Sequence, residues 1–244
     1  MPSQKNTNRF ERRFARALVT AQRIYQPARI WMKYTYESFD ENPYQPRVAQ
    51  KVVGLAFLSC VSYWEQYLED IFLAYMCGAK DVEGNGPQLL LGPCRSRSHA
   101  LQILGAANGP GDPSRSLRWS DFKWVKHVAS LFFKDGKPFT DVENEVVARL
   151  FDANDIRNRV AHDSAKARLQ FKRVANRLRG FDVSTPLPRG FSPGELLATV
   201  APPDSFGKLQ WLASDDHHWD DIFENFIMMY FNLAEFLTPI HPIA

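Results

Sequence analysis

The chain has 244 residues, of which 45% are hydrophobic and 23% charged, so it can bury a sizeable core and is not disordered as a whole. Its longest uncharged apolar stretch, Val52 to Trp64, is well short of the roughly 20 apolar residues that a membrane helix needs. The N-terminal segment has basic residues but no continuous apolar core, so we expect no secretory signal. Three cysteines, an odd number, argue against a disulfide scaffold and for a reducing compartment. These features predict a cytoplasmic protein without a membrane partner.

The net charge of +3 is unevenly distributed along the chain. Residues 1–50 carry nine Lys and Arg against four Asp and Glu, whereas residues 205–244 carry one against six. Such an asymmetry permits a polyanionic partner without requiring one.

Apolar residues recur at helical spacing from the N-terminus onward. A first helix is expected around Phe10 to Ala21, and the segment 41–46, with two prolines, interrupts the chain. Residues 47–77 are apolar on most faces and are followed by Gly78, which predicts a long, central, buried helix with a glycine C-cap. Residues 84–118 are rich in Gly, Pro and Ser, with a short helical piece at 98–104.

The second half of the chain also predicts helices. Ser120 is expected to cap a helix that ends at Asp135-Gly136, and Thr140 to Glu143 has the form of a capping box that opens the next helix. Ser164 is expected to cap a helix running to Arg179, with Gly180 after it. Residues 181–193 are expected to be loop, 201–214 irregular or one short strand, and 215–237 a last helix. The expected buried stripe of the helix after the capping box is Val142, Val146, Leu150, Ala153, Ile156 and Val160.

The predicted fold class is therefore all-α, a single domain without internal repeats. We divide it into an N-terminal basic helical extension (1–45), a helical core (46–180), and a loop with a C-terminal helix that packs on the core (181–244).

Two groups of residues suggest metal or thiol chemistry but have simpler interpretations. The cluster 215–221, which includes His217 and His218, offers metal-ligand spacing, yet Ser214 followed by acids is also typical of a capped helix start. Cys60 and Cys77 are about 25 Å apart along one helix and cannot share a metal. No glycine-rich phosphate loop is present. We expect no cofactor and no metal.

The strongest candidate for chemistry is the segment 156–163, which contains Arg157, Asn158 and His162 at the end of an amphipathic helix. The helix that follows, 165–179, has six cations and no acid, and a phosphate backbone would relieve their mutual repulsion. The simpler interpretation is a solvated helix face. The candidate nucleic-acid contacts are Arg159, Lys166, Arg168, Lys172 and Arg173.

The stretch from Phe57 to Ile71 and the segment Ile156 to His162 together resemble the HEPN superfamily, and more narrowly its RiboL-PSP-HEPN-like branch. The resemblance covers roughly Val48 to Phe171 and implies a helical bundle, commonly a homodimer, that acts as a metal-independent endoribonuclease in toxin or anti-phage defence systems. It implies a catalytic group of Arg157, His162 and Asn158, in which Asn158 corresponds to the family's polar residue after the arginine. It also implies two kinds of partner. One is RNA, with tRNA and mRNA as candidates, and the other is an antitoxin or a sensor protein. Some HEPN toxins have a tyrosine, two residues beyond the histidine, that a partner antitoxin modifies. This chain has Ser164 at that position, so the resemblance does not imply this mode of control.

Arg and His suit RNA cleavage by the RNA's own 2′-hydroxyl, because His moves protons near neutral pH and Arg stabilises a charged phosphorane. Arg157 and His162 are five residues apart, about 140° around an ideal helix, so two copies facing each other would present both groups to one phosphate more readily. Two alternatives remain. One is a non-catalytic helical module that binds RNA or protein, and the other is a metal-dependent phosphohydrolase that uses the 215–221 cluster.

Overall fold

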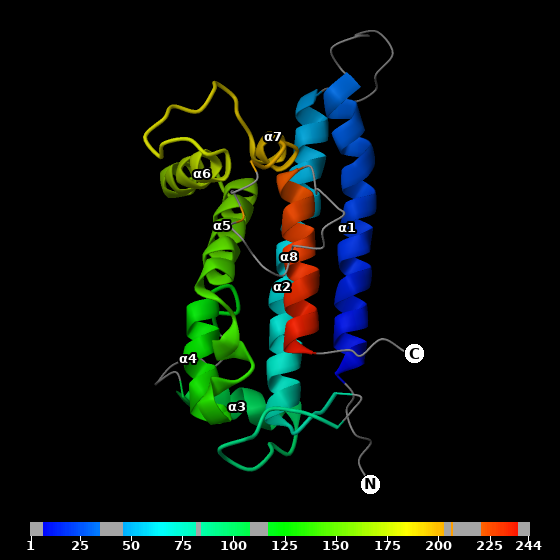
Figure 1. Ribbon diagram of the computed structural model, residues 1–244, viewed down its shortest axis with the longest axis vertical. Coiled ribbons are helices and arrows are strands. Elements are labelled where there is room, and N and C mark those ends of the chain that lie inside the picture. Colours follow the sequence, from blue (N-terminus) through cyan, green and yellow to red (C-terminus); the bar gives the residue numbers. More distant parts are fainter. Residues whose placement is uncertain are drawn as a thin grey trace. The chain divides into compact units, whose positions relative to one another are not determined.

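The computed structural model of the chain describes residues 7–34, 46–81, 84–107, 117–202, 206 and 221–238. Among these residues β-pairing is limited to two isolated bridges, Leu89 with Phe133 and Val200 with Asp221, so the predicted all-α fold is confirmed. None of the described helices combines the length and the apolar content that crossing a bilayer requires. The helices, labelled in Figure 1, are α1 (Asn8–Tyr34), α2 (Pro46–Met76), α3 (Arg97–Ala107), α4 (Phe122–Phe132), α5 (Asn144–Ala161), α6 (Ala165–Leu178), α7 (Pro193–Leu197) and α8 (Ile222–Leu237).

The long helix α2 forms as its sequence predicts. Pro46 occupies its first turn, where the missing N–H costs nothing. At its other end Gly78 has φ +76°, and the N–H of Ala79 donates to the carbonyl of Ala74. This bond closes a left-handed glycine cap and satisfies a carbonyl of the last turn.

The start of α4 differs by one residue from the prediction. The Oδ1 of Asp121 accepts hydrogen bonds from the backbone N–H groups of Lys123 and Trp124, so Asp121 is the cap. The prediction of Ser120 was wrong because a carboxylate next to it fills the same role with a stronger acceptor.

The predicted capping box at Thr140 was also wrong. Thr140 lies inside a 3-10 turn, Phe139–Asp141, and its Oγ1 donates to the carbonyl of Asp135 at 2.7 Å. Helix α5 begins later, at Asn144. The hydroxyl of Thr140 therefore stabilises the turn from Lys134–Gly136 to Phe139–Asp141 rather than the helix start.

Helix α6 begins and ends as predicted, whereas α7 was not expected. The Oγ of Ser164 accepts the N–H of Ala167 at 3.1 Å, and Gly180 has φ +72° after the last turn. The short helix α7 has the same kind of start, because the Oγ of Ser192 accepts the N–H of Glu195. The buried face of α6 is as predicted and consists of Phe171, Val174, Ala175 and Leu178.

Helix α8 begins at Ile222, where the Oδ1 of Asp221 accepts the N–H of Glu224 at 3.0 Å. Residues 215–220, predicted as its first turns, and Ser214, predicted as its cap, lie outside the described residues. Apart from residues 201, 202 and 206, the predicted irregular segment 201–214 lies outside them as well.

The chain divides into two compact units built from interleaved segments. Of the described residues, the first unit holds 7–15, those between 64 and 147, and 233–238. Its core is an aromatic cluster around Phe72, whose ring lies 5.1 Å from that of Phe133 and 5.1 Å from that of Phe139. The hydroxyl of Tyr75 donates to the carbonyl of Leu237 at 2.6 Å, which satisfies a carbonyl at the end of α8.

The second unit holds, of the described residues, 16–34, 46–63 and those between 148 and 232. Within it the later part of α1, the first half of α2 and the start of α8 lie side by side (Figure 1). The ring of Phe223 stacks on Tyr25 of α1 with centroids 4.0 Å apart and lies 6.1 Å from Phe57 of α2.

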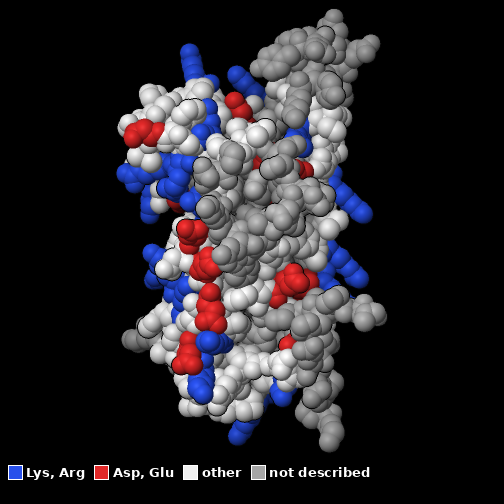
Figure 2. Space-filling model, viewed as in Figure 1, with Lys and Arg blue, Asp and Glu red and all other residues white. Residues whose placement is uncertain are grey.

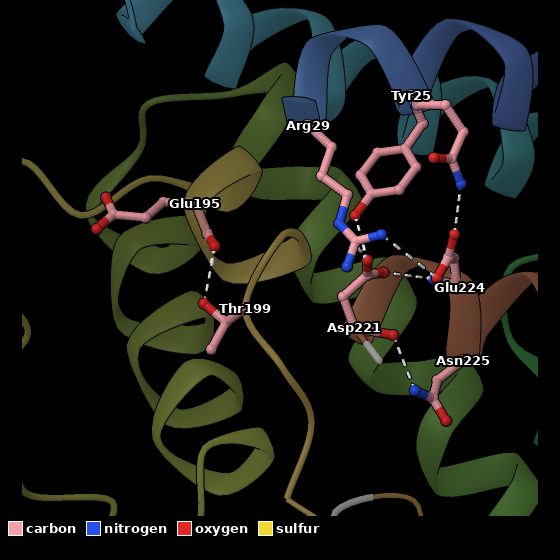
Figure 3. A network of polar contacts seen from close by, with 8 residues as sticks. Tyr25, Arg29, Glu195, Thr199, Asp221, Glu224 and Asn225 are labelled. Atoms are coloured by element: carbon pink, nitrogen blue, oxygen red, sulfur yellow. Dashed lines mark hydrogen bonds and ion pairs between the residues drawn. The ribbon is translucent and has the colours of Figure 1, made fainter. Parts of the chain in front are cut away.

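A buried polar network joins α1 to the start of α8 in this unit (Figure 3). Asp221 is fully buried, and its Oδ2 accepts the Tyr25 hydroxyl at 2.6 Å and lies 3.0 Å from the Nε of Arg29. Glu224 accepts from the amide of Gln26 at 2.5 Å. Because a buried carboxylate is costly without partners, this network fixes where the start of α8 meets α1.

Candidate active site

The end of α5 presents the predicted catalytic residues, and it belongs entirely to the second unit. Ile156 is fully buried, as the predicted stripe requires, and anchors this turn of the helix. Val160 is half-buried, and its side chain lies against Gly54 of α2. This packing leaves Arg157, Asn158 and His162 partly or fully accessible.

Arg157 and Asn158 contact each other directly. The Nη1 of Arg157 donates to the Oδ1 of Asn158 at 3.1 Å, and both side chains are half-buried. The side-chain carbonyl of Asn158 therefore orients one edge of the guanidinium group.

His162 follows Ala161, the last residue of α5, and its side chain is exposed. Its backbone N–H donates to the carbonyl of Asn158 at 2.8 Å, which continues the helical pattern by one residue. The structure thus brings Arg157 and Asn158 into contact and places His162 about one turn further on, at the exposed helix end.

The turn after His162 is held by three charged side chains. Asp163 lies 2.9 Å from the Nη1 of Arg159 on α5 and 2.7 Å from the Nη2 of Arg168 on α6. The hydrogen bond from Arg168, together with the charges of both arginines, lowers the pKa of Asp163. All three groups are accessible to solvent, so the ion pairs order the turn but contribute little stability.

The cations of α6 do not form an unpartnered basic face. Lys172 donates to the backbone carbonyl of Ser184, and Arg177 pairs with the buried Asp152 of α5. Arg168 pairs with Asp163 as described above. Acids from neighbouring segments therefore offset part of the charge, and the mutual repulsion is weaker than the sequence of α6 alone predicts.

The remaining cations of α6, and Arg179 directly after it, differ in their surroundings. The guanidinium of Arg179 lies 4.7 Å from the ring centroid of Phe181 and 4.8 Å from that of Phe191. Lys166 and Arg173 are exposed. Figure 2 shows basic side chains gathered over α6, with single acidic side chains between them.

Burial perturbs two carboxyl groups on α5 near this site. Desolvation raises the pKa of Asp152, although the charges of Arg149 and Arg177 act against that rise. Desolvation, followed by the charge of Asp152, raises the pKa of Asp155. Asp152 lies 2.8 Å from Arg149 of the same helix and also pairs with Arg177 of α6, so its second ion pair links α6 to α5.

An open groove of about 990 Å³ adjoins the end of α5. Two predicted nucleic-acid contacts, Arg159 and Arg168, line it, whereas Lys166, Lys172 and Arg173 do not. The predicted catalytic residues Arg157, Asn158 and His162 are not among its lining residues either.

Three further cations of this groove, Arg47, Lys51 and Arg189, were not predicted from the sequence. Arg47 and Lys51 are four residues apart on α2 and so share a helix face, the one signal in the sequence that could have indicated them.

The metal-dependent alternative concerns the 215–221 cluster, of which only Asp221 belongs to the described residues. They contain no group of three or more His, Cys, Asp or Glu residues that could hold a metal. His217 and His218 lie outside the described residues, and Asp221 is occupied by Tyr25 and Arg29. Burial raises the pKa of the Cys60 thiol, which disfavours the reactive thiolate.

Comparison of the chain with family models, curated proteins and solved structures gives no match. The function is therefore argued from the residues of the chain.

Proposed function

We propose that this protein is a metal-independent endoribonuclease whose catalytic groups are Arg157 and His162. One observation carries the proposal: an exposed histidine stands at the end of α5, one turn from an arginine that an asparagine holds by a hydrogen bond. The sequence resemblance to HEPN ribonucleases assigns roles to the same residues.

The proposed reaction uses the RNA's own 2′-hydroxyl as nucleophile. A bond forms between the 2′-oxygen and phosphorus while the bond from phosphorus to the 5′-oxygen breaks. His162 accepts the proton of the 2′-hydroxyl as the new bond forms, and the departing 5′-oxygen takes a proton from the imidazolium or from water, since an imidazole can accept and donate protons near neutral pH. Arg157 stabilises the negative charge that develops on the phosphorane oxygens. The products are a 2′,3′-cyclic phosphate and a 5′-hydroxyl.

The active species in this proposal is a homodimer. Arg157 and His162 are separated by about 140° around the helix axis, so one copy presents them in different directions. A two-fold axis near the end of α5 would bring Arg157 of one copy towards His162 of the other. A role in bacterial toxin or anti-phage systems, with an antitoxin or sensor as a further partner, belongs to the same proposal and depends on the resemblance.

A non-catalytic RNA-binding module is the second candidate, and the cations of the groove favour it. The two are separated by expressing the wild-type chain beside His162→Ala and scoring growth and RNA breakage. An endoribonuclease slows growth and fragments RNA only with His162 in place, whereas a binding module gives the same result with both chains. Purified protein should cleave equally well with EDTA, which separates the proposal from a metal-dependent phosphohydrolase.

A further inference from the structure

Three segments of the second unit form the walls of the groove next to α5. The first turns of α2 provide one wall, the turn between α5 and α6 provides another, and residues 188–195, up to the start of α7, provide the third. In Figure 1 these segments lie together at one end of the unit. None of these residues belongs to the proposed catalytic group, so the groove is a separate feature.

Two glycines allow the walls to approach closely. A Cβ on Gly194 would lie 1.9 Å from the backbone oxygen of Gln50, so α7 touches the backbone of α2 at a place where only glycine fits. Beside it the Oγ of Ser192 lies 3.0 Å from the Oε1 of Gln50. A Cβ on Gly54 would lie 3.3 Å from a methyl of Val160, so α2 and α5 are also tightly packed. The groove is therefore held by close backbone packing on both sides.

The groove has an excess of positive charge. Its lining includes two acids, Asp163 and Glu195, and the carboxylate of Asp163 is shared between two of the groove's own arginines. Within the described part of the chain, no acidic side chain pairs with the other three cations, which are exposed. The five cations of the lining are Arg47, Lys51, Arg159, Arg168 and Arg189.

The lining also has an aromatic and apolar part. Phe191 is half-buried, and its ring stacks on Phe171 with centroids 6.3 Å apart. Leu55, 57% exposed, and Pro188 add apolar surface. The guanidinium of Arg179 lies 4.8 Å from the centroid of the same ring, so the aromatic part of the lining is itself packed. A positively charged groove is the feature by which proteins hold the backbone of a single strand, since phosphates contact the cations. The groove's volume of about 990 Å³ is large enough for a few nucleotides.

We propose that this groove binds single-stranded nucleic acid through its phosphates, and that a phosphate takes the place of Asp163 between Arg159 and Arg168. The site carries the strand past the end of α5, where Arg157 and His162 lie. Only the choice of RNA over DNA rests on the proposed ribonuclease function.

The test measures binding separately from cleavage. The probe is a fluorescent 12-nucleotide RNA with 2′-O-methyl groups, which lacks the attacking hydroxyl, and anisotropy is followed over a range of salt concentrations. The double variant Arg47→Gln/Lys51→Gln should bind about tenfold more weakly than wild type. The slope of log affinity against log salt should fall by about 1.4, for two lost phosphate contacts on a single strand. The same RNA as a duplex should bind more weakly to wild type.

The matched control is Arg16→Gln/Arg23→Gln, which removes two exposed cations of α1 that do not line the groove. This control variant should change the affinity for the RNA less than about twofold and leave the slope of log affinity against log salt unchanged. Circular dichroism should show that both double variants are folded. Asp163→Asn should tighten binding, because the anion that competes with phosphate is gone. The proposal is overturned if the groove and control variants lose affinity equally, if Asp163→Asn weakens binding, or if polyglutamate displaces the RNA as well as unlabelled RNA does.

These outcomes are independent of catalysis. Loss of affinity in the groove variant, together with wild-type protein that leaves unmodified RNA intact, supports the binding site and refutes the ribonuclease. Cleavage of unmodified RNA with unchanged affinity in the groove variant refutes the binding site and leaves the ribonuclease standing.

Discussion

The Nη1 of Arg157 lies 3.1 Å from the Oδ1 of Asn158, its neighbour in the chain. Consecutive residues on a helix point about 100° apart, so this contact requires the long arginine side chain to bend towards the amide. The geometry makes Asn158 a positioning residue for the guanidinium group.

Asn158→Ala should therefore lower the rate of RNA cleavage by about tenfold, less than the loss in Arg157→Ala, because the guanidinium remains but is no longer oriented. The effect should fall on kcat with KM nearly unchanged. Asn158→Gln, which keeps an amide on a longer side chain, should recover part of the rate. Steady-state kinetics on a short RNA measures all three. Equal kcat in wild type and Asn158→Ala would contradict the positioning role.

The dimer can be tested by mixing two inactive chains. Arg157→Ala and His162→Ala should each be inactive alone, and a heterodimer formed from both retains one intact pair across the interface. Refolding the two chains together should restore measurable cleavage. A wild-type chain that sediments as a monomer at assay concentrations, with cleavage linear in protein, would exclude the shared site.

The close approach of α7 to α2 predicts a strong packing effect at Gly194. Gly194→Ala should destabilise the fold by at least about 1–3 kcal/mol, since its methyl meets the backbone of Gln50, which cannot move aside as a flexible side chain would. Gly92 is the control because a Cβ added there would meet nothing within 4 Å, and Gly92→Ala should stay within about 0.5 kcal/mol. Urea unfolding of both variants measures the difference. Similar midpoints would show that α7 does not pack on α2 as described.

The raised pKa of Asp155 predicts a pH-dependent effect on stability. A carboxyl group with a raised pKa binds its proton more tightly in the folded chain than in the unfolded chain. The stability that this group contributes is therefore fully present below its ordinary pKa and is lost as the pH rises through its pKa in the folded chain. Asp155→Asn should therefore raise the melting temperature at pH 7 and change it little near pH 3. The carboxyl of Asp182 has its pKa lowered by the hydroxyl and N–H of Ser184, so Asp182→Asn should have the opposite sign at pH 7. Thermal melts across this pH range check both, and a lower melting temperature for Asp155→Asn at pH 7 would contradict the assignment.

Local signals in the sequence predicted those elements whose ends depend on neighbouring residues. Helix α6 is one example, with Ser164 at its start and Gly180 after its end. Thr140 shows the limit, because its hydroxyl has a competing acceptor in the carbonyl of Asp135, which only the folded turn brings near. Helix α5 instead begins at Asn144.

The candidate site was predicted only where it is continuous in the chain. Arg157, Asn158 and His162 belong to one helix end, so their proximity follows from the sequence. Arg47 and Arg189 line the groove from segments that are far from α5 in the sequence. The spacing of apolar residues along the chain does not show which distant segments come together in the fold. Likewise, a count of cations along α6 could not show that Arg177 pairs with Asp152 of another helix.

Cleavage by an Arg157–His162 site is tested most directly by comparing two RNAs of one sequence, one unmodified and one with 2′-O-methyl groups throughout. Purified wild-type protein in EDTA should cut the first, leave the second intact, and produce fragments ending in 2′,3′-cyclic phosphate. Arg157→Ala and His162→Ala should lose this cleavage by about 10³-fold while keeping the wild-type melting temperature, because neither side chain belongs to the buried core. Cleavage of the methylated RNA, or full activity in either folded variant, would contradict the account.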